Sequence, residues 1–331
     1  MLEQKKQTLL KIDGIGVSRL KDFFDASHLK AAEQELNFIE KNNIETLYFK
    51  DENYPEKLKH CIDGPLLLFQ RGNINLKNQR IISVVGTRKI TQSGIAFCEK
   101  FIEELSPLNP VIVSGFAYGV DIAAQKAAIA NNLQTIGCLA HEFDQIYPRV
   151  HHKYVASVEE NGGFFTDFWS SDNFDRNNFL KRNRIIAGLS EATVVIESAE
   201  KGGSLVTADI ANSYNREVFA VPGRPSDKLS KGCNNLIKSQ RAQLLNSAAD
   251  LVYLLNWQPE KETKAVQKQL FVDMDNEENS VVAFLQKEGK AQLDSIALNC
   301  NFPSYKTAGI LINMELKGVV RPLPGKLFEL I

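Results

Sequence analysis

The chain has 331 residues, of which 44% are hydrophobic and 24% charged, an ordinary composition for a globular protein of two or three domains. Its formal net charge of −1 excludes a strong overall positive field. Any nucleic-acid binding must therefore come from a local basic patch.

The cysteines and the opening segment indicate the compartment. The five cysteines include no C-x-x-C pair, which argues against a disulfide framework or a zinc ribbon and favours a reducing environment. The opening MLEQKKQTLLKIDG lacks the apolar run of a signal peptide, and no apolar stretch of about 18 residues follows. We expect a cytoplasmic protein with no membrane span, no metal and no cofactor.

Residues 1–75 are predicted to form a small helical domain. LLKIDGIGVSRLKDFF has an apolar turn, a break at Gly14 and Gly16, and a second amphipathic run, typical of a helix-hairpin-helix (SAM-like) domain. There the glycines would let backbone amides approach a DNA phosphate, although a tight turn between two packed helices gives the same pattern. The connector that follows ends in an apolar strand, PLLLFQRG.

Residues 80–256 alternate short apolar strands with helices. The predicted strands lie in RIISVVGTR, PVIVSGFAYG, LQTIGCLA, GGFFTDF, EATVVIESAE and REVFAVPG. The helices lie in SGIAFCEKFIEEL, VDIAAQKAAIANN and SLVTADIANSYN. This alternation predicts an α/β fold with a Rossmann-like, doubly wound, mostly parallel sheet that is covered on both faces.

The C-terminal part reads as a linker and a third domain. Residues 257–276 are polar and without periodicity, which indicates a linker. Residues 277–331 contain three helical runs and then VVRPLPGKLFELI, in which Pro324 and Gly325 would form the turn between two strands. This order predicts a winged-helix domain.

Two loops after strands are candidates for anion binding, because ligands of parallel sheets bind beyond the carboxyl ends of the strands. In the first, Gly86 permits a tight turn, Thr87 offers a hydroxyl and an amide, and Arg88 offers a planar fork that suits phosphate. A single arginine in such a place is as often solvated or ion-paired. In the second, small residues would bring amides close to an anion, and Asp121 would cap the next helix. We predict that this loop binds through Ser114, Gly115, Phe116, Ala117 and Gly119.

A basic cluster forms the third candidate. Over residues 173–188, four cations oppose one acid: Arg176, Lys181, Arg182 and Arg184 against Asp175. A merely solvated helix face usually alternates with acids, so the cluster predicts an anionic partner. Asn183 would hold a loop or touch a phosphate, and Phe179 would either stack under a base or fill the core.

A glycine-rich turn forms the fourth candidate. After the strand TVVIESAE come Lys201, Gly202, Gly203 and Ser204, and a helix begins there. Strand, glycine turn and helix stand in the order that an anion site at a helix N-terminus requires. Ser204 would be an N-cap or a phosphate ligand.

The motifs VVGTR, SGFAYGVDIAA, FDQIYP, RNRIIAGLS, GGSLVTA and VFAVPG stand in the order and approximate spacing of the DNA-processing protein A (DprA, also called Smf) family. The chain resembles this family closely over about 80–225 and more loosely outside. The resemblance implies single-stranded-DNA binding and protection, homodimers, and loading of the RecA recombinase onto incoming DNA during natural transformation. It implies no catalytic step.

The resemblance also implies residue roles. Arg88 matches the arginine of the family's G-S-R motif and would hold a phosphate. Arg182, Asn183 and Arg184 match the family's RNR run, in which the last two would chiefly brace the pocket. Arg149 joins the predicted DNA ligands.

The chain departs from the family pattern at a few positions. Lys181 replaces a proline, Phe143 replaces a glycine, and His151 stands where asparagine is common. TDFW replaces the Ser-Glu-x-Pro expected after Gly163.

Two other functions fit parts of the sequence. A nucleotide-processing Rossmann-fold enzyme would need an acid or base, for which His141 with Asp144, or Glu197, are the candidates. A duplex-binding winged-helix regulator would use SYKTAGILINMELKG as its recognition helix, but six acids balance six bases over 277–331. We expect a DNA-binding protein that is not an enzyme.

Overall fold

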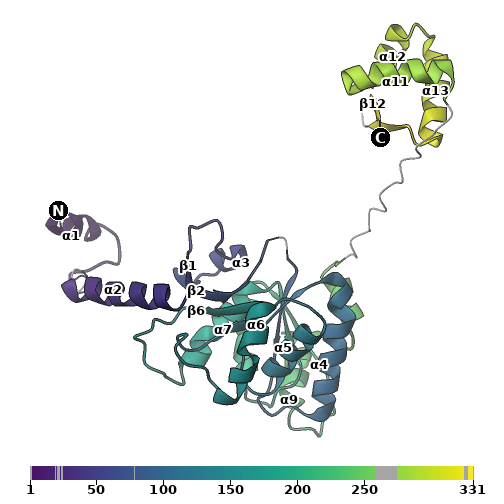
Figure 1. The fold of residues 1–331 in the computed structure, drawn as a ribbon. Helices are drawn as coiled ribbons and strands as arrows, with labels where there is room; N and C mark the ends of the chain where they lie inside the picture. The colour runs from purple at the N-terminus through teal and green to yellow at the C-terminus, as the bar shows by residue number, and fades with distance from the viewer. Residues whose placement is uncertain are drawn as a thin grey trace. The chain divides into compact units, whose positions relative to one another are not determined.

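The computed structural model describes residues 2–18, 20, 23, 25–77, 79–257, 274–323 and 327–330. The chain divides into two compact units, residues 1–259 and 260–331 (Figure 1). Most of the predicted linker, and the predicted turn at Pro324 and Gly325, lie outside the described residues.

A nine-stranded sheet forms the centre of the first unit. Its strand order is β1-β2-β6-β5-β4-β3-β7-β8-β9. The strands are β1 (Glu45–Tyr48), β2 (Leu67–Gly72), β3 (Ile81–Val85), β4 (Val111–Ser114), β5 (Thr135–Cys138), β6 (Gly162–Thr166), β7 (Ala192–Val195), β8 (Glu217–Ala220) and β9 (Gln243–Leu244). The seven strands from β3 to β9 are parallel, and β1 and β2 extend the sheet antiparallel beyond β6. The predicted Rossmann-like, mostly parallel sheet is confirmed, and it begins at residue 45, ahead of the predicted residue 80.

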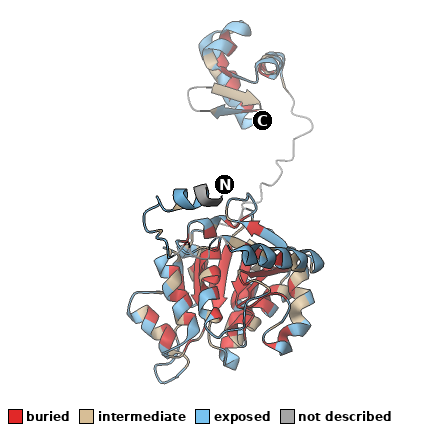
Figure 2. Cartoon of the chain, turned by 90° about the vertical axis from the view of Figure 1, so that its left-hand side faces the viewer, coloured by how far each residue is buried: buried red, intermediate tan, exposed pale blue. Residues whose placement is uncertain are grey.

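Helices cover both faces of this sheet, and the strands between them are buried (Figure 2). On one face pack α4 (Gln92–Leu105), α5 (Val120–Ala130), α6 (Val155–Glu160) and α10 (Ala248–Leu254). On the other pack α3 (Glu56–Lys59), α7 (Asn178–Leu189), α8 (Gly203–Ser213) and α9 (Lys231–Lys238). The short 3-10 helices η1 (Ser106–Leu108) and η2 (Arg149–Tyr154) follow α4 and precede α6. Strand β3 contributes to both layers: Ile82 and Val84 face the first, and Ile81 and Val85 the second. Its central residue, Ser83, is buried, and its hydroxyl donates to the carbonyl oxygen of Ile186 at 2.6 Å.

Two helices precede the sheet, α1 (Leu2–Leu9) and α2 (Ala26–Lys41). The second helical run predicted in VSRLKDFF lies partly outside the described residues, and its described positions are turns. Asp25 caps α2 by accepting a hydrogen bond from the Ser27 amide at 2.8 Å. The buried Glu35 anchors α2 to the unit, since its carboxylate accepts from the amide of Ser170 at 3.0 Å and from its hydroxyl at 2.5 Å. The helix-hairpin-helix assignment stays a prediction.

The second unit has a core of its own. Its elements are α11 (Asn276–Glu288), β10 (Lys290–Gln292), α12 (Leu293–Asn299), α13 (Ser304–Leu316), β11 (Val320–Leu323) and β12 (Leu327–Leu330). The three strands form an antiparallel sheet in the order β10-β12-β11. The three helices and the closing strand pair match the sequence prediction, which did not include β10. The winged-helix assignment stays a prediction.

The strand order reverses direction at β3. From β3 the chain builds outward through β4, β5 and β6, and then returns to place β7 on the other side of β3. The helices that follow β3 and β7 lie on opposite faces, α4 on one and α8 on the other. A crevice forms at such a switch point, beyond the carboxyl ends of the two strands.

The antiparallel edge depends on glycines where β2 meets β6. Gly72 stands opposite Gly163, and a Cβ at Gly163 would lie 2.2 Å from the carbonyl oxygen of Arg71. We predict that Gly163→Ala lowers the free energy of unfolding by about 1–3 kcal/mol, because both strands must move apart. Urea unfolding measures this loss. The control is Gly203→Ala, where no atom lies within 4 Å of the added Cβ, and an equal loss in both variants would contradict the close approach.

Candidate functional site

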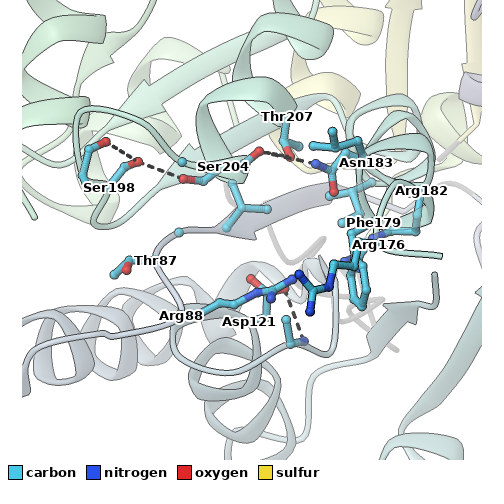
Figure 3. Close-up of a pocket in the computed structure, with 18 of the residues that line it drawn as sticks. Thr87, Arg88, Asp121, Arg176, Phe179, Arg182, Asn183, Ser198, Ser204 and Thr207 are labelled. Carbon is cyan, nitrogen blue, oxygen red and sulfur yellow. Dashed lines mark hydrogen bonds between the residues drawn. The ribbon is translucent and has the colours of Figure 1, made fainter. Parts of the chain in front are cut away.

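A pocket of about 810 Å³ lies at the switch point, large enough for a small-molecule ligand or one unit of a polymer. Its walls come from the loops that follow β3, β4, β5, β6 and β7, from one face of α7 and from the start of α8 (Figure 3). Segments that are distant in sequence therefore form one concave surface.

The loops after β3 and β7 are bonded to each other. The amide of Thr87 donates to the carbonyl oxygen of Glu197 at 2.7 Å, and the Thr87 carbonyl accepts from the amide of Val120 at 3.1 Å. The Glu197 carboxylate accepts from the amide and the hydroxyl of Thr91, at 2.9 and 2.5 Å. A Cβ on Gly86 would lie 2.4 Å from the Val120 side chain, so this turn requires glycine. Glu197, a candidate acid from the sequence, thus holds the loop that carries Arg88.

Arg88 reaches from this loop to an aromatic wall. Its guanidinium carbon lies 4.9 Å from the ring centroid of Phe179, a cation–π distance. Tyr147 and Phe174 contact Phe179 with centroid distances of 5.6 and 5.9 Å, and they are 40% and 43% exposed. The sequence prediction included only Phe179. Phe174 lies five residues before Phe179, beside the same basic cluster, and Tyr147 lies in the motif FDQIYP. Their positions in the sequence could therefore have marked both rings as candidates.

One face of α7 turns toward the pocket. Arg176, just before the helix, and Phe179, Asn183 and Ile186 recur at intervals of three or four residues and line the pocket. Asn183 is buried, and its side-chain amide donates to the carbonyl oxygen of Gly203 at 3.4 Å. It therefore ties α7 to the start of α8.

Two members of the predicted basic cluster are not part of the pocket lining. Arg184 donates to the carbonyl oxygen of Asp63 at 2.7 Å and forms an ion pair with Asp167. Lys181 is exposed on α7 beside the pocket-facing residues. Residues two apart on a helix point about 200° apart, so Arg182 and Arg184 face different ways.

Arg182 is a fixed part of the pocket floor and not a mobile side chain at its entrance. It is buried, and its Nη1 donates to the carbonyl oxygen of Cys138 at 2.7 Å. A Cβ on Gly115 would lie 2.1 Å from this Nη1 and 2.5 Å from Oδ2 of Asp121, so the charged pair packs against a glycine. Burial lowers the pKa of Arg182 and raises the pKa of Asp121, and the charge of each opposes the shift of the other.

The expected cap of α5 has a different geometry. Gly119 is the N-cap, whereas the Asp121 carboxylate in the first turn accepts from the amide of Ala117 at 3.4 Å. The φ of Gly119 is +78°, and a Cβ there would lie 2.1 Å from the carbonyl oxygen of Thr87. This glycine lets the two loops meet.

Only one of the residues predicted from the second loop lines the pocket, namely Ala117. Ser114 is buried and donates to the carbonyl oxygen of Val84 at 2.6 Å. The ring of Phe116 is buried 5.0 Å from that of Phe164. Ser114, Gly115, Phe116 and Gly119 thus shape the pocket from behind, and Arg149 lies exposed at the start of η2, outside the lining.

The start of α8 supplies amide groups. Lys201, Gly202, Gly203 and Ser204 all line the pocket, and the helix begins at Gly203. Ser204 does not cap this helix, because it lies inside the first turn and its hydroxyl donates to that of Ser198 at 3.1 Å. The first amides of a helix have no acceptor within it, and they carry partial positive charge.

Positively charged side chains outnumber acidic ones in the pocket lining. Its lining holds four cations and one acid: Arg88, Arg176, Arg182 and Lys201 against Asp121. Together with the helix N-terminus, they favour an anion. The aromatic wall offers a flat apolar surface beside it.

Both ring nitrogens of His141, a candidate catalytic residue, contact backbone groups. Its Nδ1 lies 2.7 Å from the carbonyl oxygen of Glu142, and its Nε2 accepts from the amide of Tyr147 at 3.2 Å. Burial lowers its pKa.

Within the described ranges, no three His, Cys, Asp or Glu side chains are grouped to hold a metal. No helix of the described part is long and apolar enough to span a membrane.

The fold and the site define a doubly wound α/β protein with a cationic pocket at the switch point of its sheet. Among known proteins, the model of the family described as DNA recombination-mediator protein A matches residues 45–256, well over half of the chain. The chain belongs to this family, which is also named DprA or Smf.

Individual relatives agree with this assignment. The chain is 36% identical to the DNA processing protein DprA of Streptococcus pneumoniae over 202 residues, which are 61% of the chain and 71% of the relative. It is 32% identical to the protein Smf of Escherichia coli over 301 residues, 89% of the chain and 80% of the relative.

Two solved structures have the same core. The S. pneumoniae DprA structure aligns with a TM-score of 0.61 at 33% identity, and covers 66% of this chain and 77% of that one. DNA processing protein A from Helicobacter pylori, whose structure concerns its single-stranded DNA binding mode, aligns with a TM-score of 0.58 at 29% identity. That alignment covers 64% of this chain and 95% of that one.

Two buried histidines predict a pH dependence of stability. Burial lowers the pKa of His141 and of His151 below the ordinary 6.5. As the pH falls below about 6.5, the unfolded chain binds more protons than the folded one, so stability decreases by up to about 1.4 kcal/mol per pH unit for each histidine. Urea unfolding between neutral and mildly acidic pH measures the slope.

The matched variants isolate the source of this slope. His141→Gln should reduce it, whereas His152→Gln, at an exposed position, should not. An unchanged slope in His141→Gln would contradict the assignment.

Proposed function

We propose that this protein binds single-stranded DNA at the switch-point pocket. A phosphate of the strand rests against the first amides of α8 and the Arg88 guanidinium, and a base stacks on the aromatic wall. The observation that carries the proposal is the convergence of helix N-terminus, unequal charge and exposed aromatic rings in one pocket. The single-stranded DNA binding mode described for the H. pylori relative supports it.

The chemistry of the pocket favours single strands over duplex. Contacts from amides and guanidinium groups to phosphates do not distinguish bases. Stacking on Phe179, Phe174 or Tyr147 needs a base whose face is free, which a single strand offers at little cost. Binding should therefore be largely independent of sequence.

We extend the proposal to a role in recombination. The protein would protect incoming single strands and load the RecA recombinase onto them during natural transformation, acting as a homodimer. The family's description as a recombination mediator supports this role. A two-site dimer would also gain affinity for one long strand through avidity.

The proposed role needs no catalytic step. His141 and Glu197 are both engaged in hydrogen bonds that hold loops, which leaves them poorly placed as acid or base. Turnover of nucleotides by the purified protein would instead favour the enzyme alternative.

A duplex-binding regulator is less well supported. Two lysines at α13 are engaged with α11, Lys306 with Glu277 and Lys317 with Glu278. Such pairing lowers the positive potential that a recognition helix presents to DNA.

Arg88 provides the direct test. We expect Arg88→Ala to weaken binding of an oligodeoxynucleotide by about 1–3 kcal/mol, the value of a charged hydrogen bond, by a similar factor for different sequences. The slope of log K against log salt should become shallower by about 0.7, because one phosphate contact is lost. Fluorescence anisotropy over a salt titration measures both.

The control is Arg241→Ala, an exposed arginine paired with Asp209 and outside the pocket. It removes the same charge and should leave affinity nearly unchanged. Equal effects of the two variants, or none from Arg88→Ala at moderate salt, would refute the pocket as the DNA site.

A further inference from the structure

A second group of basic and aromatic side chains lies beside the pocket, on α5, η2 and the loop after β4. We call it the η2 strip: Tyr118, Lys126, Arg149, Lys153 and Tyr154. Both lysines and Arg149 are exposed, and Tyr118 is 45% exposed. None of the five residues lines the pocket itself.

Ring contacts hold the strip together. Tyr118 packs edge-on against His151 at 5.1 Å, and His151 packs against Tyr154 at 6.0 Å. His151 is fixed in turn, because its Nδ1 lies 2.9 Å from the carbonyl oxygen of Phe116. The exposed ring of Tyr118 thus stands on a rigid base.

Two lysines from different elements converge on Tyr154. The Nζ of Lys126, on α5, lies 5.9 Å from the ring centroid, and the Nζ of Lys153, on η2, lies 5.1 Å from it. The two elements thus place two positive charges beside one ring, and together these charges favour an anion. The η2 segment itself supplies no opposing acid, since no Asp or Glu occurs between residues 145 and 158.

The strip adjoins the pocket at Tyr118. The preceding residue, Ala117, lines the pocket. The following residue, Gly119, packs so closely on the first loop that a Cβ there would lie 2.7 Å from the Cα of Arg88. Tyr118 therefore adjoins the loop that carries Arg88 on one side and, through His151, the ring of Tyr154 on the other.

We propose that the η2 strip is a second contact surface for the same single strand, which leaves the pocket over Tyr118 and places phosphates at Lys126 and Lys153. The inference rests on the proposed function of the pocket. A short oligomer fills the pocket alone, and a longer one also occupies the strip. The alternative is that both lysines only cover the ring of Tyr154.

The experiment uses the full chain with the double variant Lys126→Gln/Lys153→Gln. Oligodeoxythymidylates of about 5 and about 20 nucleotides bracket common single-strand site sizes. For the long oligomer, the slope of log K against log salt should become shallower by about 1.4, which is about 0.7 for each lost phosphate contact. For the short oligomer it should not change. Lys126→Arg/Lys153→Arg should restore the slope on the long oligomer.

A matched control is Lys100→Gln/Lys238→Gln, two exposed lysines on α4 and α9 outside the strip and the pocket. For the long oligomer, one contrary result is an unchanged slope of log K against log salt in Lys126→Gln/Lys153→Gln, and the other is an equal reduction in the control. Either result, with Arg88-dependent binding of the short oligomer intact, would refute the η2 strip as a contact surface. If the unaltered protein binds neither oligomer, the proposed function itself fails.

Discussion

The hydrogen bond from the Thr87 amide to the Glu197 carbonyl joins the loops at the centre of the sheet. It connects the ends of β3 and β7, the two neighbouring strands whose helices depart to opposite faces. The Glu197 carboxylate strengthens this link by binding Thr91. Because the loops are fixed to each other while the helices diverge, the space between them stays open as a pocket. Arg88 and the start of α8 are held on its two sides.

The arginines of the pocket divide into two kinds by burial. Arg182 is buried against Gly115 and Asp121 and bonded to a carbonyl oxygen, so it sets the shape and potential of the floor. Moving Arg182 away would leave the carboxylate of Asp121 buried without an opposite charge, which is costly. Arg88 is exposed and rests on an aromatic ring, so its guanidinium is accessible to a ligand. The pocket thus combines a fixed floor with an accessible cation at its entrance.

The sequence could predict the sheet and much of the pocket. Strands β3 to β8 are short apolar runs that recur with helices between them, which is a local signal. The rule that ligands bind at strand ends was sufficient to bring Arg88 and Gly203 into one pocket, and the basic cluster added Asn183. Both depend on patterns within a few residues.

What the sequence could not predict depends on distant partners. The RNR run does not show which groups Arg184 contacts: Asp167 and the Asp63 carbonyl oxygen, from other segments, hold it away from the pocket. Phe116 lies in a loop that resembles an anion site, yet its ring completes a core formed with Phe164. The edge strands β1 and β2 join the sheet through antiparallel pairing that no local pattern specifies.

If a DNA phosphate rests against the first amides of α8, as we propose, the glycine amides of that segment will respond to DNA binding. Isotope-labelled glycine in the full chain reports each glycine amide by NMR during titration with an oligodeoxythymidylate. We predict that the largest changes occur at Gly202 and Gly203, with smaller ones at Gly86, and none at Gly289 in the second unit. Changes confined to Gly14 and Gly16, with Gly203 unaffected, would contradict it.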